Sequence, residues 1–293
     1  MPVFDPAAYA RLIEAERATV LVLVPAMLGM VLQCRETSTA NVSSVRTVAY
    51  GGAPISEAVL SATFARFECG VIQMFGMTET NAAGTILNFE DNRNGRLRSC
   101  GRPFPGHEVR IVGATGDPVA TGKIGEIEIR GPALMTGYWN RIEATAETIT
   151  SEGWLNTGDA GYRDGDGYFY VHDRVKYMIV SGGEDVYPAE VENAIMGCPG
   201  VAEAAVIGVP DAKWGEAVKA MVIRAPGAEV CEAAVIAWVR TRIAGYKTPK
   251  SVEFVDALPR NGTNKVLRRV LREPYWAGRG GVGGVASRTM ARA

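Results

Sequence analysis

The chain has 293 residues, of which 47% are hydrophobic and 22% are charged, and its formal net charge is −1. This balance is typical of a folded globular protein of about two domains, and it argues against disordered and fibrous classes. The near-neutral charge gives no electrostatic reason to expect nucleic-acid binding.

The cysteine pattern and the apolar segments predict the cellular location of the protein. The five cysteines form no C-x-x-C pair, which favours buried thiols in a reducing compartment. The first residues have no basic stretch followed by an apolar core, so no secretory signal is expected. The longest apolar run, residues 20–32, contains Pro25 and Gly29 and is shorter than the about 20 residues that cross a bilayer. We therefore expect a cytoplasmic protein without a transmembrane segment, with peripheral membrane contact left open.

The first part of the chain alternates predicted helices and strands. Apolar residues near helical spacing predict a helix over residues 9–17, and β-branched runs predict buried strands at 19–24 and 45–50. A helix follows the first strand, and residues 55–67 return to the helical pattern. Strands alternating with helices are typical of a mostly parallel α/β sheet.

From residue 101 the pattern changes to short strands. Those at 108–112 and 125–130 are separated by glycine-containing turns, which predicts an antiparallel sheet or a small barrel. A short helix is predicted over 140–149. A hairpin over 161–171 surrounds the turn DGDG.

A new α+β unit is predicted from residue 173 or 174 onward. Helices are expected over 188–196, where Pro188 suits the first turn, and over 230–243. Strands are expected at 201–209, 217–224 and 251–255. The glycine-rich end of the chain has too few apolar residues to fold, so it is expected to be a disordered tail.

Five short motifs follow one another along the chain. They are GGAP at 51–54, FGMTET at 75–80, GWLNTGD at 153–159, DRVKYMIVSGGEDVYPAEVE at 173–192 and PRNGTNK at 259–265. Together they resemble the latter part of the adenylate-forming (AMP-binding) superfamily of acyl-CoA synthetases, luciferases and peptide-synthetase adenylation domains. GEIEIRGPALMTGYWN and SGGEDVYPAEVE look most like a fatty or aryl acid–CoA ligase.

The resemblance spans about residues 2–275 and implies a fold that is part α/β and part α+β. Residues 1–172 would be the C-terminal portion of the large sheet-and-helix AMP-binding domain, with a small β-barrel-like part. Residues 173–275 would form the small mobile α+β C-terminal domain, and 276–293 the tail. The family's phosphate-binding loop, which comes earlier in its chains, has no counterpart here. We therefore expect a truncated large domain with an unpaired sheet edge, which a protein partner could cover, and the activity of the truncated chain alone stays open.

The reaction implied by the resemblance has two halves. A carboxylic acid attacks ATP to give acyl-AMP and pyrophosphate, and the thiol of CoA then displaces AMP, with Mg²⁺ assisting. In-line attack at phosphorus needs alignment and charge neutralisation more than a protein nucleophile. Two alternatives stay open: a non-catalytic remnant that binds AMP or a partner protein, and an adenylating enzyme that loads a carrier protein.

The adenine site would lie after the strand at 45–50. By resemblance the pocket is lined by Gly51, Gly52, Ala53 and Pro54. Glycine lets the backbone turn sharply and approach a flat ligand without interference from Cβ. The alternative is an ordinary turn at the end of a strand.

FGMTET combines an aromatic ring, a glycine, a hydroxyl group and a carboxylate. By resemblance Phe75 covers adenine, Gly76 gives the turn its freedom, and Thr78 offers its hydroxyl to the α-phosphate. Glu79 would be the catalytic carboxylate that binds Mg²⁺, which usually takes one or two carboxylates together with phosphate oxygens. The alternative is that Thr78 and Glu79 only cap the next helix.

Two charged residues would bind the ribose. The carboxylate of Asp159 can accept hydrogen bonds from both ribose hydroxyls, and Arg174 could contact ribose or phosphate. The alternatives are a turn aspartate and an exposed surface ion pair.

The remaining residues belong to the C-terminal part. Asp173 matches the hinge between the two domains of the superfamily, and Gly182 and Gly183 would let the backbone approach the pantetheine arm of CoA. Lys265 would bridge the substrate carboxylate and the α-phosphate in the transition state. The family's usual glycine before this lysine is Asn264, which tolerates left-handed backbone angles. The alternatives are a tight turn for the two glycines and a solvated surface position for the lysine.

Overall fold

The computed structural model describes residues 4–53, 55–93, 96, 99–261 and 265–277. Its contacts divide the chain into two compact units, which are described separately below. The first unit comprises Met1–Gly113, Asp117–Thr157 and Gly161–Val171, and the second comprises Ala114–Gly116, Gly158–Ala160 and the chain from His172 onward.

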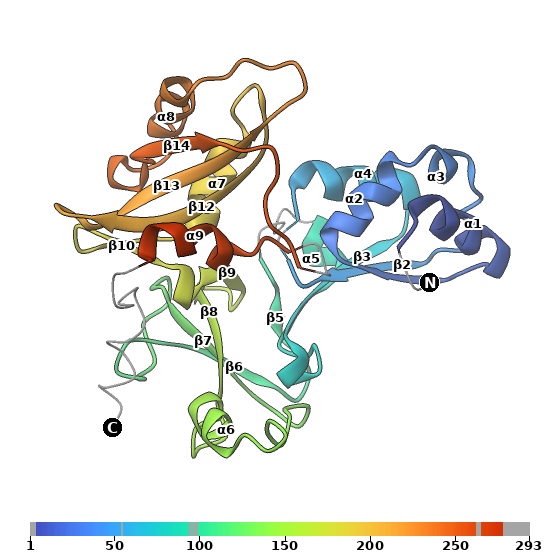
Figure 1. Cartoon of the computed structure of the whole chain (residues 1–293). Coiled ribbons are helices and arrows are strands. Elements are labelled where there is room, and N and C mark those ends of the chain that lie inside the picture. The colour runs from blue at the N-terminus through green and yellow to red at the C-terminus, as the bar shows by residue number, and fades with distance from the viewer. Residues whose placement is uncertain (1–3, 54, 94–95, 97–98, 262–264, 278–293) are drawn as a thin grey trace. The chain divides into compact units, whose positions relative to one another are not determined.

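The first unit begins with a five-stranded sheet of order β1-β2-β3-β4-β5. Figure 1 labels three of its strands, β2, β3 and β5. The first three strands are parallel, and β4 and β5 are antiparallel to their neighbours. The strands are β1 (Val20–Leu23), β2 (Thr47–Gly51), β3 (Gly70–Phe75), β4 (Thr85–Leu87) and β5 (Arg102–Pro103). The parallel part agrees with the α/β pattern expected from the sequence.

Helices alternate with these strands and share one apolar core with them. They are α1 (Pro6–Glu16), α2 (Pro25–Gln33), α3 (Arg35–Thr39), α4 (Glu57–Phe67) and α5 (Phe89–Arg93). Asp5 caps α1 by accepting hydrogen bonds from two backbone N–H groups, and Ser56 caps α4. Leu28 of α2, Leu60 of α4 and Val48 of β2 are fully buried in the shared core.

Strand β1 lies at the end of the sheet order. Leu21 and Leu23 point into the core, whereas Val20 and Val22 are 57% and 66% exposed. The alternation follows from the two-residue period of a strand. One side of β1 therefore presents two valines to solvent.

The second sheet has the order β6-β7-β8-β9. Its strands are β6 (Glu108–Val112), β7 (Gly125–Arg130), β8 (Leu155–Arg163) and β9 (Phe169–Arg174), and the short helix α6 (Ile142–Thr148) precedes β8. The sequence left open an antiparallel sheet or a small barrel. Among the described residues the four strands form an open sheet, with β6 and β7 antiparallel, and no closed barrel.

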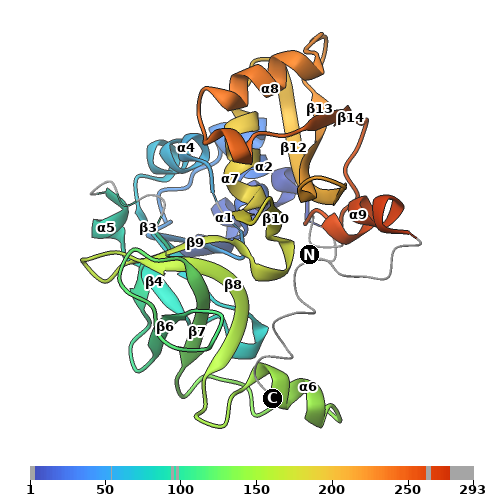
Figure 2. The ribbon, with the colours of Figure 1, turned by 90° about the vertical axis from the view of Figure 1, so that its left-hand side faces the viewer.

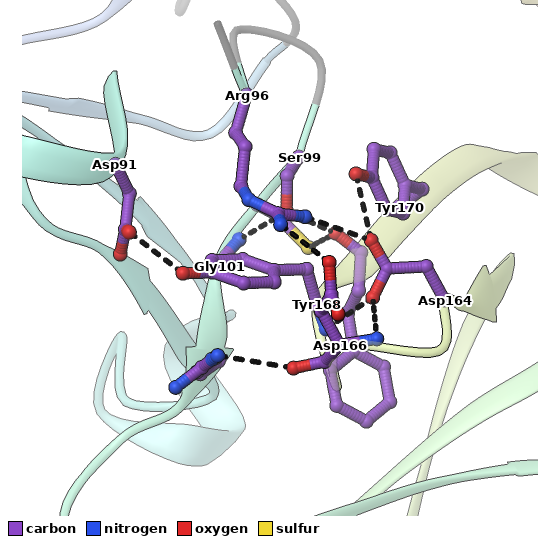
Figure 3. A network of polar contacts seen from close by, with 11 residues as sticks. Asp91, Arg96, Ser99, Gly101, Asp164, Asp166, Tyr168 and Tyr170 are labelled. Carbon is purple, nitrogen blue, oxygen red and sulfur yellow. Dashed lines mark hydrogen bonds and ion pairs between the residues drawn. The ribbon is translucent and has the colours of Figure 1, made fainter. Parts of the chain in front are cut away.

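A polar network fastens the hairpin turn between β8 and β9 within the first unit (Figure 3). Arg96 forms ion pairs with Asp164 at 3.1 Å and Asp166 at 2.5 Å. Its guanidinium also lies 4.0 Å from the ring of Tyr168, whose hydroxyl donates to Asp91 at 2.6 Å. The carboxylates of the DGDG turn therefore have structural partners.

The second unit is an α+β module. Its sheet has the order β11-β10-β13-β12, and β14 pairs in parallel with β13. The strands are β10 (Ile179–Ser181), β11 (Glu184–Val186), β12 (Val201–Asp211), β13 (Gly215–Arg224) and β14 (Ser251–Phe254). The helices are α7 (Pro188–Met196), α8 (Glu232–Arg240) and α9 (Arg268–Trp276).

Apolar side chains of the strands and of α7 and α8 form the core of this unit. Val191 and Ile195 of α7 and Val235 and Val239 of α8 are fully buried. Helix α8 packs beside β14, as Figure 2 shows. Helix α9 packs on β12 and ends at Trp276, whose indole N–H donates to the carbonyl of Gly208 at 3.1 Å. The expected tail lies outside the described residues from residue 278 onward.

Two further expectations concern helices and thiols. In the described part of the chain, no helix has the length and apolar character needed to span a membrane. The expectation of buried thiols is wrong for two cysteines: Cys231 is exposed and Cys34 is half-buried, because they lie at the starts of α8 and α3. Cys69, Cys100 and Cys198 are buried.

Candidate functional site

Two glycines form the end of β2 and the start of the loop that follows it. A Cβ at Gly51 would lie 2.4 Å from the carbonyl oxygen of Met74, and Gly52 has φ 78°. Ala53 is exposed beside them. Pro54, also predicted in the adenine pocket, lies outside the described residues. The glycines therefore satisfy a close approach of β2 to β3 and leave an open backbone at the strand end.

The loop after β3 is equally tight. A Cβ at Gly76 would lie 2.5 Å from the carbonyl carbon of Ala82, so this position also requires glycine. Phe75 is half-buried and packs against the apolar cluster that contains Ile127 and Ile129. Its ring therefore has a packing role in the first unit besides the adenine contact predicted from sequence.

A single 3₁₀ turn, η1 (Thr78–Thr80), carries the predicted catalytic residues of this loop. Thr80 is buried, and its hydroxyl accepts a hydrogen bond from the N–H of Met77 at 3.1 Å. Thr80, rather than Thr78 or Glu79, therefore caps the turn. Thr78 is exposed and Glu79 is half-buried, so their side chains are not used for capping.

Among the described residues, only one of the two oxygens of the Glu79 carboxylate has a hydrogen-bond partner. Its Oε1 accepts a hydrogen bond from the hydroxyl of Tyr138 at 2.7 Å. Within the described residues, Oε2 has neither a hydrogen-bond nor an ion-pair partner, and no three His, Cys, Asp or Glu side chains cluster as a metal site. One carboxylate with a free oxygen fits Mg²⁺, which takes its remaining ligands from phosphate and water.

In the second unit, Asp159 and Arg174 form an ion pair. The Nε of Arg174 lies 2.7 Å from Oδ1 of Asp159, whose side chain is 13% exposed. Burial raises the pKa of the Asp159 carboxyl, although the positive charges of Arg174 and Lys265 oppose this rise. The pair is therefore more buried than the surface ion pair considered as an alternative.

The charges of Asp159 and Arg174 also act on Lys265. Lys265 is exposed, as the alternative of a solvated position expected. Partial desolvation and the charge of Arg174 lower the pKa of its ammonium group, whereas Asp159 acts in the opposite direction. Residues 262–264 of its loop lie outside the described residues. The base of the loop is closed by two hydrogen bonds between Asn261 and Lys265, at 2.9 and 3.0 Å. Lys265 is therefore held at its backbone, next to Asp159 and Arg174.

The predicted hinge residue has a fixed carboxylate. Asp173 Oδ1 accepts from the N–H of Arg174 at 2.7 Å, and Oδ2 accepts from the N–H of Ala189 in the first turn of α7 at 2.8 Å. Negative charge at a helix N-terminus is stabilising. The sequence interpretation gave Asp173 a conformational role without a particular chemical group, and it missed this contact with α7.

The sequence also gave no signal for the ion pair between Glu192 and Arg268. Both oxygens of Glu192 accept from Nη2 of Arg268, at 2.8 and 2.6 Å, and one also accepts from the N–H of Val206. The two side chains are only 16% and 15% exposed. Arg268 begins α9, three residues after Lys265, so this pair fixes the chain just beyond the predicted catalytic lysine.

Gly182 and Gly183 form the two-residue turn between β10 and β11. Both have positive φ, 63° and 88°, as a tight hairpin of this kind requires. A Cβ at Gly182 would lie 2.7 Å from the ring of Trp214, whereas one at Gly183 would meet no atom within 4 Å. Trp214 is 40% exposed, and the ammonium groups of Lys213 and Lys250 lie 4.5 and 5.8 Å from its ring centre. Sequence reasoning named the glycines and missed this aromatic, positively charged surface.

Comparison with known proteins gives the family. Residues 1–139 match the family described as AMP-binding enzyme, and residues 190–265 match the AMP-binding enzyme C-terminal domain. The chain belongs to the AMP-binding enzyme family. The family predicted from the five motifs is therefore confirmed.

Relatives within the AMP-binding enzyme family differ in substrate and acceptor. A feruloyl-CoA synthase of Amycolatopsis sp is 45% identical over 93% of this chain and 55% of its own length. A fatty acid–[acyl-carrier-protein] ligase of Streptomyces coeruleorubidus, ScoC, is 40% identical over 88% of this chain and 50% of its own. The crystal structure of ATP-bound MatB from Rhodopseudomonas palustris superposes with a TM-score of 0.85 at 37% identity, covering 94% of this chain and 54% of that one. The chain thus spans about half the length of the relatives that it matches.

Proposed function

We propose that this chain takes part in the ATP-dependent activation of a carboxylic acid to acyl-AMP, followed by transfer of the acyl group to CoA. The acid would be a fatty or aryl acid, since the relatives include both a feruloyl-CoA synthase and a fatty acid ligase. ATP, Mg²⁺ and CoA are the small molecules required, and a cytoplasmic location fits this chemistry.

One observation carries the proposal: Asp159 and Arg174 form an ion pair within the second unit, and Lys265, which is distant from them in sequence, lies near enough for both charges to shift the pKa of its ammonium group. Two cations beside a buried carboxylate suit a ligand that offers both phosphate and hydroxyl groups, such as AMP. The carboxylate would accept from ribose, and Lys265 would neutralise charge between the substrate carboxylate and the α-phosphate.

The first unit would contribute the strand-end loops. Gly51, Gly52, Ala53, Pro54, Phe75 and Gly76 would bind adenine, and Thr78 would donate its hydroxyl to the α-phosphate. Glu79 would hold Mg²⁺, which when bound neutralises negative charge on the phosphate oxygens. The free oxygen of Glu79 and the exposed hydroxyl of Thr78 support these roles.

The second half-reaction would use the turn at Gly182 and Gly183. Gly183 leaves open space for the pantetheine arm, and Trp214 with Lys213 and Lys250 offers a ring face and two positive charges for the nucleotide end of CoA. We propose that rotation about Asp173 moves the domain 173–275 so that Lys265 serves adenylation and this turn serves thioester formation.

The test measures the two half-reactions, adenylation and thioester formation, separately. ATP–pyrophosphate exchange with ferulate and long-chain fatty acids reports adenylation, and conversion of synthetic acyl-AMP with CoA reports thioester formation. Lys265→Ala should lower exchange by about 10²–10³-fold and leave the second half intact, because one stabiliser of transition-state charge is lost. Lys123→Ala, in the exposed turn before β7, is the matched control and should change neither. AMP binding without exchange would overturn the catalytic proposal and favour a non-catalytic AMP-binding protein.

A second candidate keeps adenylation and changes the acceptor. The relative ScoC is named as an acyl-carrier-protein ligase, which favours a carrier-protein phosphopantetheine in place of free CoA. Adenylate formation with transfer only to a phosphopantetheinylated carrier protein would support this alternative. A protein partner bound along the edge of β1 stays a separate prediction.

A further inference from the structure

Glu79 is attached at two points to one short segment of the first unit. The hydroxyl of Tyr138 donates to Oε1 of Glu79 at 2.7 Å, across 59 residues of sequence. The N–H of Met135 donates to the backbone carbonyl of Glu79 at 2.8 Å. The same segment therefore fixes both the backbone and the side chain of the predicted metal ligand.

The backbone of Tyr138 is itself fixed by helix α6. Its N–H donates to Oγ1 of Thr145 at 3.0 Å, and the Thr145 hydroxyl donates to the carbonyl of Arg141 at 2.8 Å. Gly137, with φ 151°, passes so close to Thr145 that a Cβ would lie 2.9 Å from its Cγ2. These contacts set the direction in which Tyr138 leaves the chain.

Helix α6 lies at the surface, where the side-chain amide of Asn156 also donates to the carbonyl of its residue Glu147 at 3.2 Å. None of its residues is buried, and Ile142 at its start is 86% exposed. Its contact with Tyr138 through Thr145 is therefore not a by-product of core packing. The contact instead orients Tyr138, whose hydroxyl donates to Glu79.

We propose that Tyr138 is a positioning residue that orients the Glu79 carboxylate for Mg²⁺. This inference rests on the proposed function, in which Glu79 binds the metal. The hydrogen bond engages Oε1, restricts rotation of the side chain and leaves Oε2 available to the cation. Side chains that orient a metal ligand in this way typically contribute about 10–100-fold to metal affinity.

The experiment measures metal affinity and does not depend on turnover. Mn²⁺ replaces Mg²⁺, and its free concentration is followed by electron paramagnetic resonance in the presence of the non-cleavable α,β-methylene analogue of ATP. Tyr138→Phe removes only the hydroxyl and should weaken Mn²⁺ binding about 10-fold. Thr145→Val should weaken it in the same direction, because the backbone of Tyr138 loses its partner.

Tyr168→Phe is the matched control. It removes another tyrosine–carboxylate hydrogen bond of the first unit, 2.6 Å long, between Tyr168 and Asp91 (Figure 3). Mn²⁺ affinity should stay at the wild-type value in this variant. An equal loss of affinity in Tyr168→Phe and Tyr138→Phe would overturn the proposal, because it would show a general structural effect.

Glu79→Gln separates this inference from the proposed function. Weaker Mn²⁺ binding in Glu79→Gln with unchanged binding in Tyr138→Phe would overturn the role of Tyr138 and leave the metal ligand in place. Unchanged binding in Glu79→Gln, or no Mn²⁺ binding by the wild-type protein, would overturn the metal role itself and the inference with it.

Discussion

Replacement of Arg268 by methionine should destabilise the second unit strongly. Glu192 would keep only the N–H of Val206 as a partner, in a position where its side chain is 16% exposed. Removing one partner of a buried ion pair costs about 3–5 kcal/mol, whereas an exposed pair contributes about 0–1 kcal/mol. The bidentate geometry and low exposure of the Glu192–Arg268 pair make it a buried ion pair in this sense.

The loss of unfolding free energy in Arg268→Met should also depend on pH. Burial raises the pKa of the Glu192 carboxyl above its ordinary value of 4.5, and the positive charge of Arg268 opposes this rise. Without Arg268 the folded-state pKa rises further, so the folded variant binds a proton more readily than the unfolded chain does. Its stability relative to wild type should therefore improve as the pH falls from neutral toward about 5.

Urea denaturation followed by circular dichroism at several pH values between about 5 and 8 measures both effects. The matched control is Arg269→Met, one residue along α9, because Arg269 pairs with Glu273 at 3.9 Å while 80% exposed. The control should lose less than about 1 kcal/mol at every pH. A loss in Arg268→Met that is equally small, or that does not change with pH, would refute the reasoning.

Three further predictions concern single residues. The rate of ATP–pyrophosphate exchange should fall at high pH, as Lys265 loses its proton at a pKa lowered by partial desolvation, and a pH–rate profile without this fall would contradict its role. Gly125→Ala should destabilise by about 1–3 kcal/mol in urea denaturation, because its Cβ would lie 2.2 Å from the backbone carbonyl oxygen of Val112, whereas Gly245→Ala, with no neighbour within 4 Å, should cost far less. Asp173→Ala should lower the free energy of unfolding by about 1 kcal/mol, as α7 loses the acceptor at its first turn, and equal stability of the alanine and wild-type proteins would argue against this contact.

The regular elements with clear periodicity were predictable from the sequence. Strands β6 and β7 and helix α7 have the predicted boundaries, because turn glycines or a proline mark their ends. Strands β4 and β5 are too short for a period to emerge, with three and two residues. Helix α9 contains Pro274, which normally argues against a helix, and it was missed for that reason.

The motifs name residues for the candidate site, and those roles stay predictions, whereas the contacts that these residues make could not be read from the sequence. Glu79 stands in a recognisable loop, but its contact with Tyr138 joins segments 59 residues apart. The contact between Glu192 and Arg268 spans 76 residues. Pairing at such distances is decided by tertiary packing, which local sequence does not encode. The tyrosine in GYWN and the arginine just after the predicted lysine were visible in the sequence, but nothing local indicated what they bind.

In the loop after β3, the side chain that closes the turn differs from the two side chains that we propose act on the ligand. Thr80 closes the turn through its buried hydroxyl, while the exposed Thr78 and the half-buried Glu79 take no part in that closure. Variants at positions 78 and 79 should therefore fold, so that a library at these two positions would separate effects on ligand binding from effects on folding.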